Sequence, residues 1–399
     1  MSCTTTCPAP VSAAPARVTA ATSRALLVAM ALITASPARA QQRAGAAVGA
    51  SAEEKAAARA NGDHNLAFTA VPGPVYNPSL GWGLMLIALA MYDVDPADAI
   101  SPGSTSALFG MATTNGSWAG GLAQKLYLSE DSWRLTGGGG YASVNQRFYG
   151  IGGDATGSWV DMNMEAVFAM AEGLRRVLPG TYAGLTLSYR QSRFKGKDAN
   201  AQAVLEAAGI NTEWDRNLLP GLRLDFDTRD VQTSPRRGLL AQLTVRGASE
   251  SLGSTNSYVR ASASYAQYQA LDDGGRHVLA WNVVAEGGFG DVPFDEYPDI
   301  GGNKALRGYI RGQFTDKNML STQAEWRWSN VWRALGIVFF GGIGKVFPAW
   351  NQLGSEAWLP SAGFGLRYML IQDRRMNARL DFAWGKEGGT FYFSVGEAF

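Results

Sequence analysis

The sequence predicts an all-β protein, a 16-stranded antiparallel transmembrane β-barrel. Three observations predict this class. Apolar and polar residues alternate strictly in segments of about ten residues or more, as in tilted membrane strands, whereas soluble strands have about five or six residues. Charged residues make up only 17% of the chain, against about 25% in typical soluble domains. The 12 Trp and 14 Tyr gather near segment ends, and membrane interfaces favour both residue types.

The first 40 residues predict a secretory signal peptide. Arg17 and Arg24 precede the apolar run 25–35, and small residues around Ala40 suit a cleavage site. The run is shorter than the roughly 20 residues that a membrane-spanning helix needs. Cleavage after Ala40 would remove Cys3 and Cys7, leaving the mature chain without a thiol or a disulfide.

Residues 41–65 are Ala-rich and polar, and they predict a periplasmic linker without a stable fold. The barrel is expected to occupy residues 66–399. Sixteen segments read as its strands: 66–77, 79–92, 104–114, 117–128, 131–147, 157–175, 180–193, 217–227, 237–250, 256–271, 276–290, 317–330, 333–346, 357–371, 375–386 and 389–399. The first segment is a poor strand by sequence, because Pro72 and Pro74 cannot donate to a ladder.

The alternation assigns each segment two faces. In segment 322–328, Trp326 and Trp328 face one way, while Gln323, Glu325 and Arg327 face the other. Lipid offers no hydrogen-bond partners, so strands in a membrane must close into a barrel, with the polar face toward the lumen. An even strand count, with short and long connections in alternation, fits bacterial outer-membrane barrels.

The charged residues on the predicted lumen face have mixed signs, which favours structural ion pairs over a selective substrate path. They are Arg190, Arg223, Asp225, Arg246, Arg260, Glu286, Arg367, Arg379 and Asp381. The net charge of +1 indicates no nucleic-acid partner.

The sequence predicts no catalytic site, no cofactor-binding site and no metal-binding site. His64 and His277 are the only histidines, and neither sits in a hydrolase or metal-ligand pattern. No Gly-x-Ser-x-Gly motif and no Walker loop occurs. Asp93, Asp95 and Asp98 suggest a solvated turn rather than a calcium site. We therefore expect a protein that is not an enzyme.

Four motifs, in order, carry a family resemblance. They are 148–152 (Phe-Tyr-Gly-Ile-Gly), the turn 227–238 with Asp-Thr-Arg-Asp and Pro-Arg-Arg-Gly, the loop motif Leu306-Arg307-Gly308-Tyr309, and an alternating C-terminus that ends in Phe399. Together they resemble the BamA/TamA-type bacterial surface-antigen family of outer-membrane barrels, over about residues 66–399. Assembly and secretion members of that family carry POTRA (polypeptide-transport-associated) domains ahead of the barrel, so the chain is expected to be a barrel-only member.

The resemblance implies two sets of site residues. In the family the long loop folds into the lumen and its Arg pairs with acids, which here implies an anchor made of Arg307, Gly308, Tyr309 and Glu325. Family members often carry an acid where this chain has Gly342, so the anchor is expected to rest on Glu325 alone. The C-terminal assembly signal would comprise Phe391, Phe393, Val395, Gly396 and Phe399, with Phe399 on the lipid face.

The expected role is that of an integral outer-membrane barrel, accessory to outer-membrane biogenesis or transport. Its expected partners are outer-membrane lipids, the barrel-assembly machinery and a periplasmic protein that the sequence does not identify. The alternative is a passive channel or structural surface protein with no assembly role, which planar-bilayer conductance would distinguish.

Overall fold

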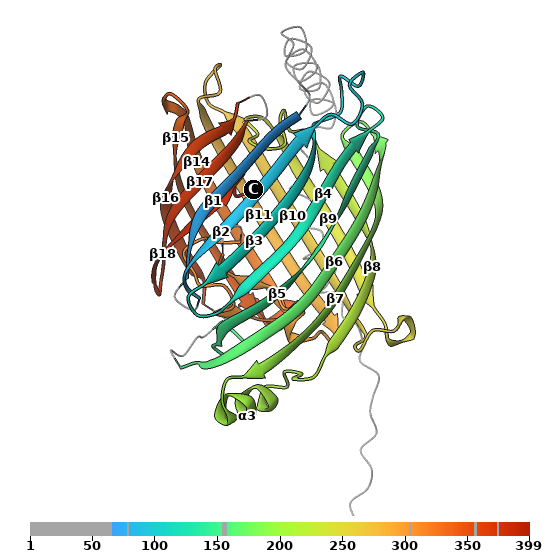
Figure 1. The fold of residues 1–399 in the computed structure, drawn as a ribbon, viewed down its shortest axis with the longest axis vertical. Coiled ribbons are helices and arrows are strands. Elements are labelled where there is room, and N and C mark those ends of the chain that lie inside the picture. The colour runs from blue at the N-terminus through green and yellow to red at the C-terminus, as the bar shows by residue number, and fades with distance from the viewer. Residues whose placement is uncertain (1–65, 78–79, 154–157, 303–304, 355–356, 373–374) are drawn as a thin grey trace, which may run out of the picture. The chain divides into compact units, whose positions relative to one another are not determined.

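The computed structural model describes residues 66–399, apart from 78–79, 154–157, 303–304, 355–356 and 373–374. The predicted signal peptide and linker lie outside the described residues. Sixteen strands form one antiparallel sheet in which each strand pairs with its neighbours along the chain, and the sheet curves into a nearly closed barrel (Figure 1). The predicted all-β, 16-stranded barrel is therefore confirmed.

The strands follow the predicted segments closely. They are β1 (Leu66–Asn77), β2 (Gly81–Tyr92), β3 (Ser104–Thr113), β4 (Trp118–Leu128), β5 (Trp133–Phe148), β6 (Val160–Leu178), β7 (Thr181–Gly196), β8 (Asp215–Asp227), β9 (Gly238–Ala248), β10 (Tyr258–Ala270), β11 (His277–Gly290), β14 (Asn318–Trp332), β15 (Leu335–Phe347), β16 (Leu359–Ile371), β17 (Met376–Gly385) and β18 (Gly388–Val395).

The two faces of the sheet differ as the alternation requires. On β14, Trp326 and Trp328 are exposed on the outer face, while Glu325 and Arg327 are buried inside. Leu222 and Leu224 are likewise exposed on β8. Among the described residues, no helix is long and apolar enough to cross a membrane.

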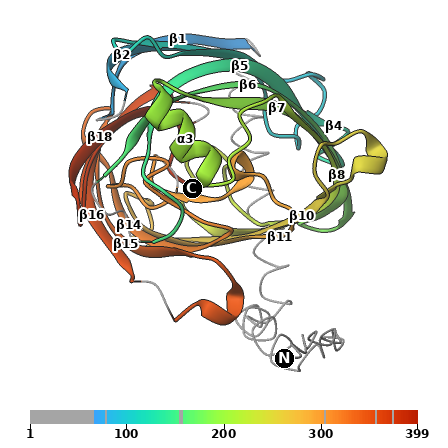
Figure 2. The ribbon, with the colours of Figure 1, turned by 90° about the horizontal axis from the view of Figure 1, so that it is seen from below.

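The connections give the barrel two different ends. At the C-terminal end, where β18 finishes, β14 and β15 are joined by residues 333–334 and β16 and β17 by residues 372–375. The opposite end, called here the loop end, carries the longest connection, 291–317. It also carries α3 (Ala199–Ala207), which lies at the lower end of Figure 1 and across the barrel opening in Figure 2.

Helix α3 was not predicted, because segment 193–212 reads as a plain loop. The helix starts where the side chain of Asp198 accepts a hydrogen bond from the backbone N–H of Ala201. Its buried residue Leu205 packs with Phe148, Met162 and Phe194. This packing, rather than local propensity, holds so short a helix.

The sheet has one interruption, between its first and last strands. β1 and β18 are in contact, but the strand order places them at the two ends of the sheet, with no ladder between them. We call this contact the seam. Pro72 and Pro74 lie in β1, whose register with β2 runs through both residues, and an edge strand tolerates proline. Segment 66–77 therefore forms a regular strand despite its two prolines. The sequence alone does not reveal that this strand lies at an edge of the sheet, where proline is tolerated.

Candidate functional site in the barrel lumen

The long connection between β11 and β14 folds inward. It contains a short ladder between β12 (Asp299–Ile300) and β13 (Phe314–Thr315). Four of its apolar residues form a buried cluster with three residues of the barrel wall: Ile300, Leu306, Tyr309, Phe314, Met319, Val346 and Leu359. Apolar burial on this scale gives the loop a fixed position inside the barrel.

Arg307 lies in this loop and is fully buried, with 0% exposure. Its Nη1 donates to Asp381 Oδ2 on β17 at 2.8 Å, and its Nη2 donates to Glu325 on β14. The guanidinium carbon also lies 3.6 Å from the ring centroid of Phe340. One planar cation is thus held by two carboxylates and an aromatic face.

The expectation that the anchor would rest on Glu325 alone is wrong. Asp381 supplies the second acid, because the curvature of the sheet brings β17 within reach of a loop that also touches β14. An acid at Gly342 would not fit: a Cβ there would lie 2.6 Å from the carbonyl oxygen of Thr322 and 2.8 Å from Cδ1 of Leu306. The loop itself occupies the space that an acid would need.

The loop motif requires a glycine at position 308, both for its backbone conformation and for its close approach to the wall. Its φ is +110°, a region that side chains rarely adopt. A Cβ would also lie 2.8 Å from the carbonyl carbon of Trp384 on β17. The loop backbone therefore approaches the wall too closely for any other residue.

Tyr309 and Tyr392 connect the loop to the last hairpin. The hydroxyl of Tyr392, on β18, accepts the Gly308 N–H at 3.0 Å and donates to the Tyr309 carbonyl at 3.0 Å. The Tyr309 hydroxyl donates to the carbonyl of Pro360 and accepts the N–H of Lys386. The motif thus binds β18, one of the two strands of the seam.

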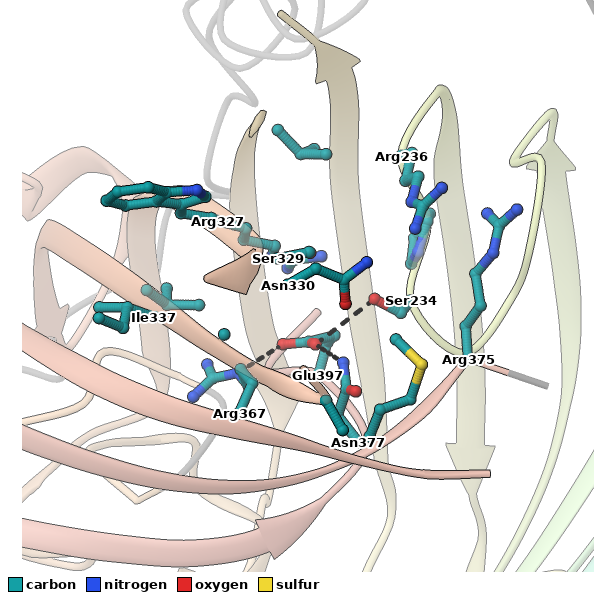
Figure 3. A pocket seen from close by; sticks show the side chains of 17 residues that line it. Ser234, Arg236, Arg327, Ser329, Asn330, Ile337, Arg367, Arg375, Asn377 and Glu397 are labelled. Atoms are coloured by element: carbon teal, nitrogen blue, oxygen red, sulfur yellow. Dashed lines mark hydrogen bonds and ion pairs between the residues drawn. The ribbon is translucent and has the colours of Figure 1, made fainter. Parts of the chain in front are cut away.

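The ion pairs continue toward the C-terminal end of the barrel. Arg327 donates to Glu325 at 2.7 Å and to a main-chain oxygen of Phe399, the last residue of the sequence, at 3.1 Å. Arg367 donates to Asp381 at 2.5 Å and to Glu397 at 2.9 Å. Figure 3 shows Glu397 between Arg367, Asn377 and Ser234. A continuous network therefore joins the loop to the residues that follow β18.

The residues of the predicted C-terminal signal occupy two environments. Phe391 stacks on Tyr76 of β1 at 5.8 Å, and the ring of Phe393 lies against Gly73 of the same strand. Both contacts cross the seam. Val395 ends β18, and Gly396 follows with a φ of +87°.

Phe399 does not continue the strand, and its expected lipid-facing position is wrong. Its ring lies 5.3 Å from the Arg327 guanidinium and packs beside Tyr268. In Figure 2 the C-terminus lies within the ring of strands. The left-handed backbone at Gly396 breaks the alternation on which the expectation depended.

Several other lumen residues also form ion pairs. Arg190 pairs with Asp295, Arg223 with Asp225 and Glu172, and Arg260 with Glu286. These pairs hold the wall strands and the loop together.

A second buried network of ion pairs, which was not predicted from the sequence, lies at the C-terminal end of the barrel. Arg134 pairs with Asp131 at 2.7 Å and with Asp227 at 2.8 Å, and its guanidinium carbon lies 3.6 Å from the ring centroid of Tyr182. Asp227 also binds Arg229 in the turn motif. Only the turn gave a sequence signal, because Arg134 and Asp131 belong to no recognisable motif.

The remaining candidates stay apart from the lumen network. His277 stacks against Trp326, at 5.8 Å between centroids. Asp98 accepts hydrogen bonds from Ser101, Ile100 and Glu130, and so links the connection 93–103 to the turn 129–132. Within the described part of the chain, no three His, Cys, Asp or Glu side chains are grouped to hold a metal ion.

A nearly closed antiparallel sheet with an apolar outer face, and a loop anchored by buried ion pairs inside it, defines a transmembrane β-barrel with a folded loop in its lumen. The chain belongs to the Omp85 superfamily, whose domain model matches residues 129–399. This confirms the resemblance that the motifs carried.

Solved structures with the same fold include BamA from Haemophilus ducreyi lacking POTRA domains 1–3, with 14% identity, a TM-score of 0.53, and coverage of 84% of this chain and 70% of that one. CdiB from Acinetobacter baumannii has 13% identity and a TM-score of 0.52, and 83% of this chain matches 59% of that one. CdiB from Escherichia coli has 10% identity and a TM-score of 0.56, and 84% of this chain matches 62% of that one.

The chain therefore spans less than two thirds of either CdiB chain. At these identities the likeness shows the fold alone. A comparison with curated protein sequences found no match.

Proposed function

We propose that the protein is an integral outer-membrane barrel that acts in outer-membrane biogenesis or transport, and that the seam is where it meets a client chain. Outer-membrane lipids surround it in this proposal, and the barrel-assembly machinery inserts it. A periplasmic protein would deliver the client. The role needs no catalytic residue, metal or cofactor.

The unpaired seam is the observation that carries this proposal. β1 and β18 touch without a ladder, so each keeps backbone groups that are free to pair with another strand. A client strand can add to such an edge by main-chain hydrogen bonds, which depend little on its sequence. The seam is held by side-chain contacts such as Tyr76 with Phe391, which can separate without breaking a ladder.

The lumen loop favours this role over the alternative of a passive channel. The loop's apolar cluster and Arg307 are buried against the wall inside the barrel. Large steady openings in planar bilayers would support the channel, whereas small irregular ones would support a barrel whose loop stays in place.

A photo-crosslinking residue at Ala70, on the outer face of edge strand β1, tests the proposal in cells. We expect covalent products with other outer-membrane barrel chains. The matched control is Leu185, which is 67% exposed on the outer face of β7, a strand paired on both sides. Equal products from both positions, or none from Ala70, would contradict a role for the seam.

Cell fractionation tests the location separately. The mature protein should be recovered with outer membranes and should migrate faster on a gel before boiling than after it. Recovery as a soluble periplasmic protein would refute the membrane location.

A further inference from the structure

The lumen side of strands β1 to β6 is apolar over three neighbouring rows of residues, one residue from each strand in a row. The register of the strands gives the central row as Val71, Ile87, Phe109, Gly121, Gly140 and Phe168. The two flanking rows start at Thr69 and Gly73 of β1 and hold no charged residue, and Thr69 is the single polar residue of all three rows. We call this surface the apolar lumen face.

The ladder between β6 and β7 shows that this face points inward. Phe168 lies opposite Arg190, and directly opposed residues share one face of a sheet. Arg190 pairs with Asp295 of the long connection that folds into the lumen. The outer face of β4 carries Leu122, which is exposed. The apolar lumen face is therefore separate from the surface that faces lipid.

The lumen loop leaves this face uncovered. The apolar cluster of the loop packs on β14, β15 and β16, and Figure 2 shows β1 and β6 across the barrel from β15. Phe109, Phe168 and Met170 remain 38%, 37% and 41% exposed. By the usual strand spacing and rise, the three rows cover about 24 Å by about 14 Å. Barrel lumens are ordinarily polar, and an exposed apolar patch of this kind marks a binding surface.

Glycines form the floor of the central row. A Cβ at Gly121 would lie 2.7 Å from Cε1 of Phe109, and a Cβ at Gly140 would lie 2.8 Å from Cζ of Phe168. The two rings thus lean over bare backbone from either side. The backbone groups beneath them already pair in the ladders. The face therefore offers a ligand apolar contact and no hydrogen bond.

One cation borders the apolar lumen face at the C-terminal end of the barrel. Lys125 follows Ala123 by two residues on β4, so the two side chains share the lumen side. Its Nζ lies 5.1 Å from the ring centroid of Tyr127 and forms no ion pair within the described part of the chain. The acid in the same row, Glu172, is bound by Arg223 at 2.8 Å. An apolar surface with a cation at one end matches an anionic amphiphile.

We propose that the apolar lumen face holds an acyl chain of a membrane phospholipid, whose phosphate lies at Lys125. The chain reaches the face from the bilayer through the seam, because β1 begins every row and has no ladder with β18. Short turns mark the C-terminal end as periplasmic, so the lipid comes from the inner leaflet. A peptide would leave its N–H and C=O groups unpaired against strands whose backbone is already bonded. This inference rests on the membrane location and not on a client chain at the seam.

A photo-crosslinking amino acid with a benzophenone side chain, placed at Phe109, tests the proposal in cells. After irradiation, mass spectrometry of the purified, digested protein should find a phospholipid attached to residue 109. The matched control is Thr244, which lies opposite Arg223 on the polar lumen side of β9 and should carry no lipid. Met170 is the second test position. If the Phe109 variant lacks the gel mobility of a folded barrel, Met170 decides alone.

The mass of the adduct identifies the occupant. Phospholipid at residues 109 and 170 but not at 244 is the expected result. A peptide from residues 41–65, a peptide from another protein or a lipid A mass would overturn the proposal by naming a different occupant. Equal lipid adducts at all three positions, or no adduct at 109 and 170, would also overturn it.

Charge reversal tests the phosphate contact. Lys125→Glu should lower the yield of phospholipid adduct at residue 109 about tenfold, because a charge-assisted hydrogen bond is replaced by repulsion. Arg311→Glu is the control, since its side chain is 80% exposed, and it should leave the yield unchanged. An unchanged yield in Lys125→Glu would overturn the placement of the phosphate. Crosslinking at Ala70 detects protein clients separately, so the absence of lipid here would leave the proposed function untouched.

Discussion

Gly308 donates its backbone N–H to the hydroxyl of Tyr392 at 3.0 Å, and the same hydroxyl donates to the carbonyl of Tyr309. One side chain of edge strand β18 thereby satisfies two backbone groups of the lumen loop. The loop and the seam are separate features in sequence, 84 residues apart, yet a single phenol joins them. Movement of β18 away from β1 would strain or break this contact.

Tyr392→Phe should therefore loosen the loop with little change in packing. The change leaves the N–H of Gly308 and the carbonyl of Tyr309 without a partner, at a cost of about 1–3 kcal/mol in the free energy of unfolding. Denaturant unfolding and limited proteolysis of residues 291–317 would measure it. Tyr368→Phe, on the exposed outer face of β16, should have no effect, and an equal effect of both changes would refute the link.

Arg307→Ala should lower the unfolding temperature and expose the loop to protease. Removing one member of a fully buried ion pair costs about 3–5 kcal/mol, because the partner is left unpaired. Glu325→Ala and Asp381→Ala should act in the same direction, and each should combine with Arg307→Ala at less than the sum. Arg307→Lys should restore little, because an ammonium cannot reach two carboxylates with a planar fork. Strict additivity in these double-mutant cycles would indicate that the paired residues have no coupling free energy.

Gly308→Ala should destabilise the barrel more than Gly312→Ala. Both glycines have positive φ, +110° and +80° respectively, which costs of the order of 1–3 kcal/mol for a side chain. Only at Gly308 would the new Cβ meet backbone atoms of β17, whereas nothing lies within 4 Å at Gly312. Thermal unfolding of the two variants measures the difference. Equal losses would mean that Gly308 does not lie against β17 as described.

Deleting Phe399 should reduce the amount of folded barrel recovered from outer membranes. Its main-chain oxygen accepts a hydrogen bond from Arg327, and its ring packs beside Tyr268, so the deletion removes both contacts from the lumen network. Heat-modifiable mobility on gels measures the folded fraction. Leu366→Ala, at a residue 44% exposed on the outer face, serves as the control. An unchanged folded fraction after the deletion would count against any role of the terminal residue in assembly or stability.

Acid should open the connection 93–103 through Asp98. Burial alone would raise the pKa of Asp98, but hydrogen bonds from Ser101, Glu130 and Ile100 outweigh it and lower the pKa to about 2, from 3.8. The folded state therefore binds this proton less readily than the unfolded state. The contribution to stability is complete above about pH 4 and is lost as the pH falls toward 2.

Hydrogen exchange in 93–103 and 129–132 should thus rise between pH 4 and pH 2, after correction for intrinsic rates. Asp98→Asn should show raised exchange at both pH values. Asp95→Asn is the control, since its side chain accepts a hydrogen bond from Ala97 within the same turn. If Asp98→Asn kept the pH dependence of the unchanged protein, another group would be responsible.

The sequence by itself determined the wall of this protein. Strand count, strand bounds and the inner and outer faces follow from alternation, which is a local property of a strand between lipid and lumen. Trp326 outside and Glu325 inside needed no knowledge of the rest of the chain. Arg307 was recognisable from its motif, although its surroundings were not.

Only the tertiary structure decided what meets inside the wall. Asp381 lies 74 residues from Arg307, and the curvature of the sheet alone makes them partners. The turn at Gly396 places Phe399 beside Arg327 instead of lipid, and the apolar lumen face becomes continuous only once the register of β1 to β6 is set. Alternation states which side of a strand faces inward, but the lumen is shared by all sixteen strands. Its contacts therefore depend on closure of the barrel, a long-range property that no short stretch of sequence encodes.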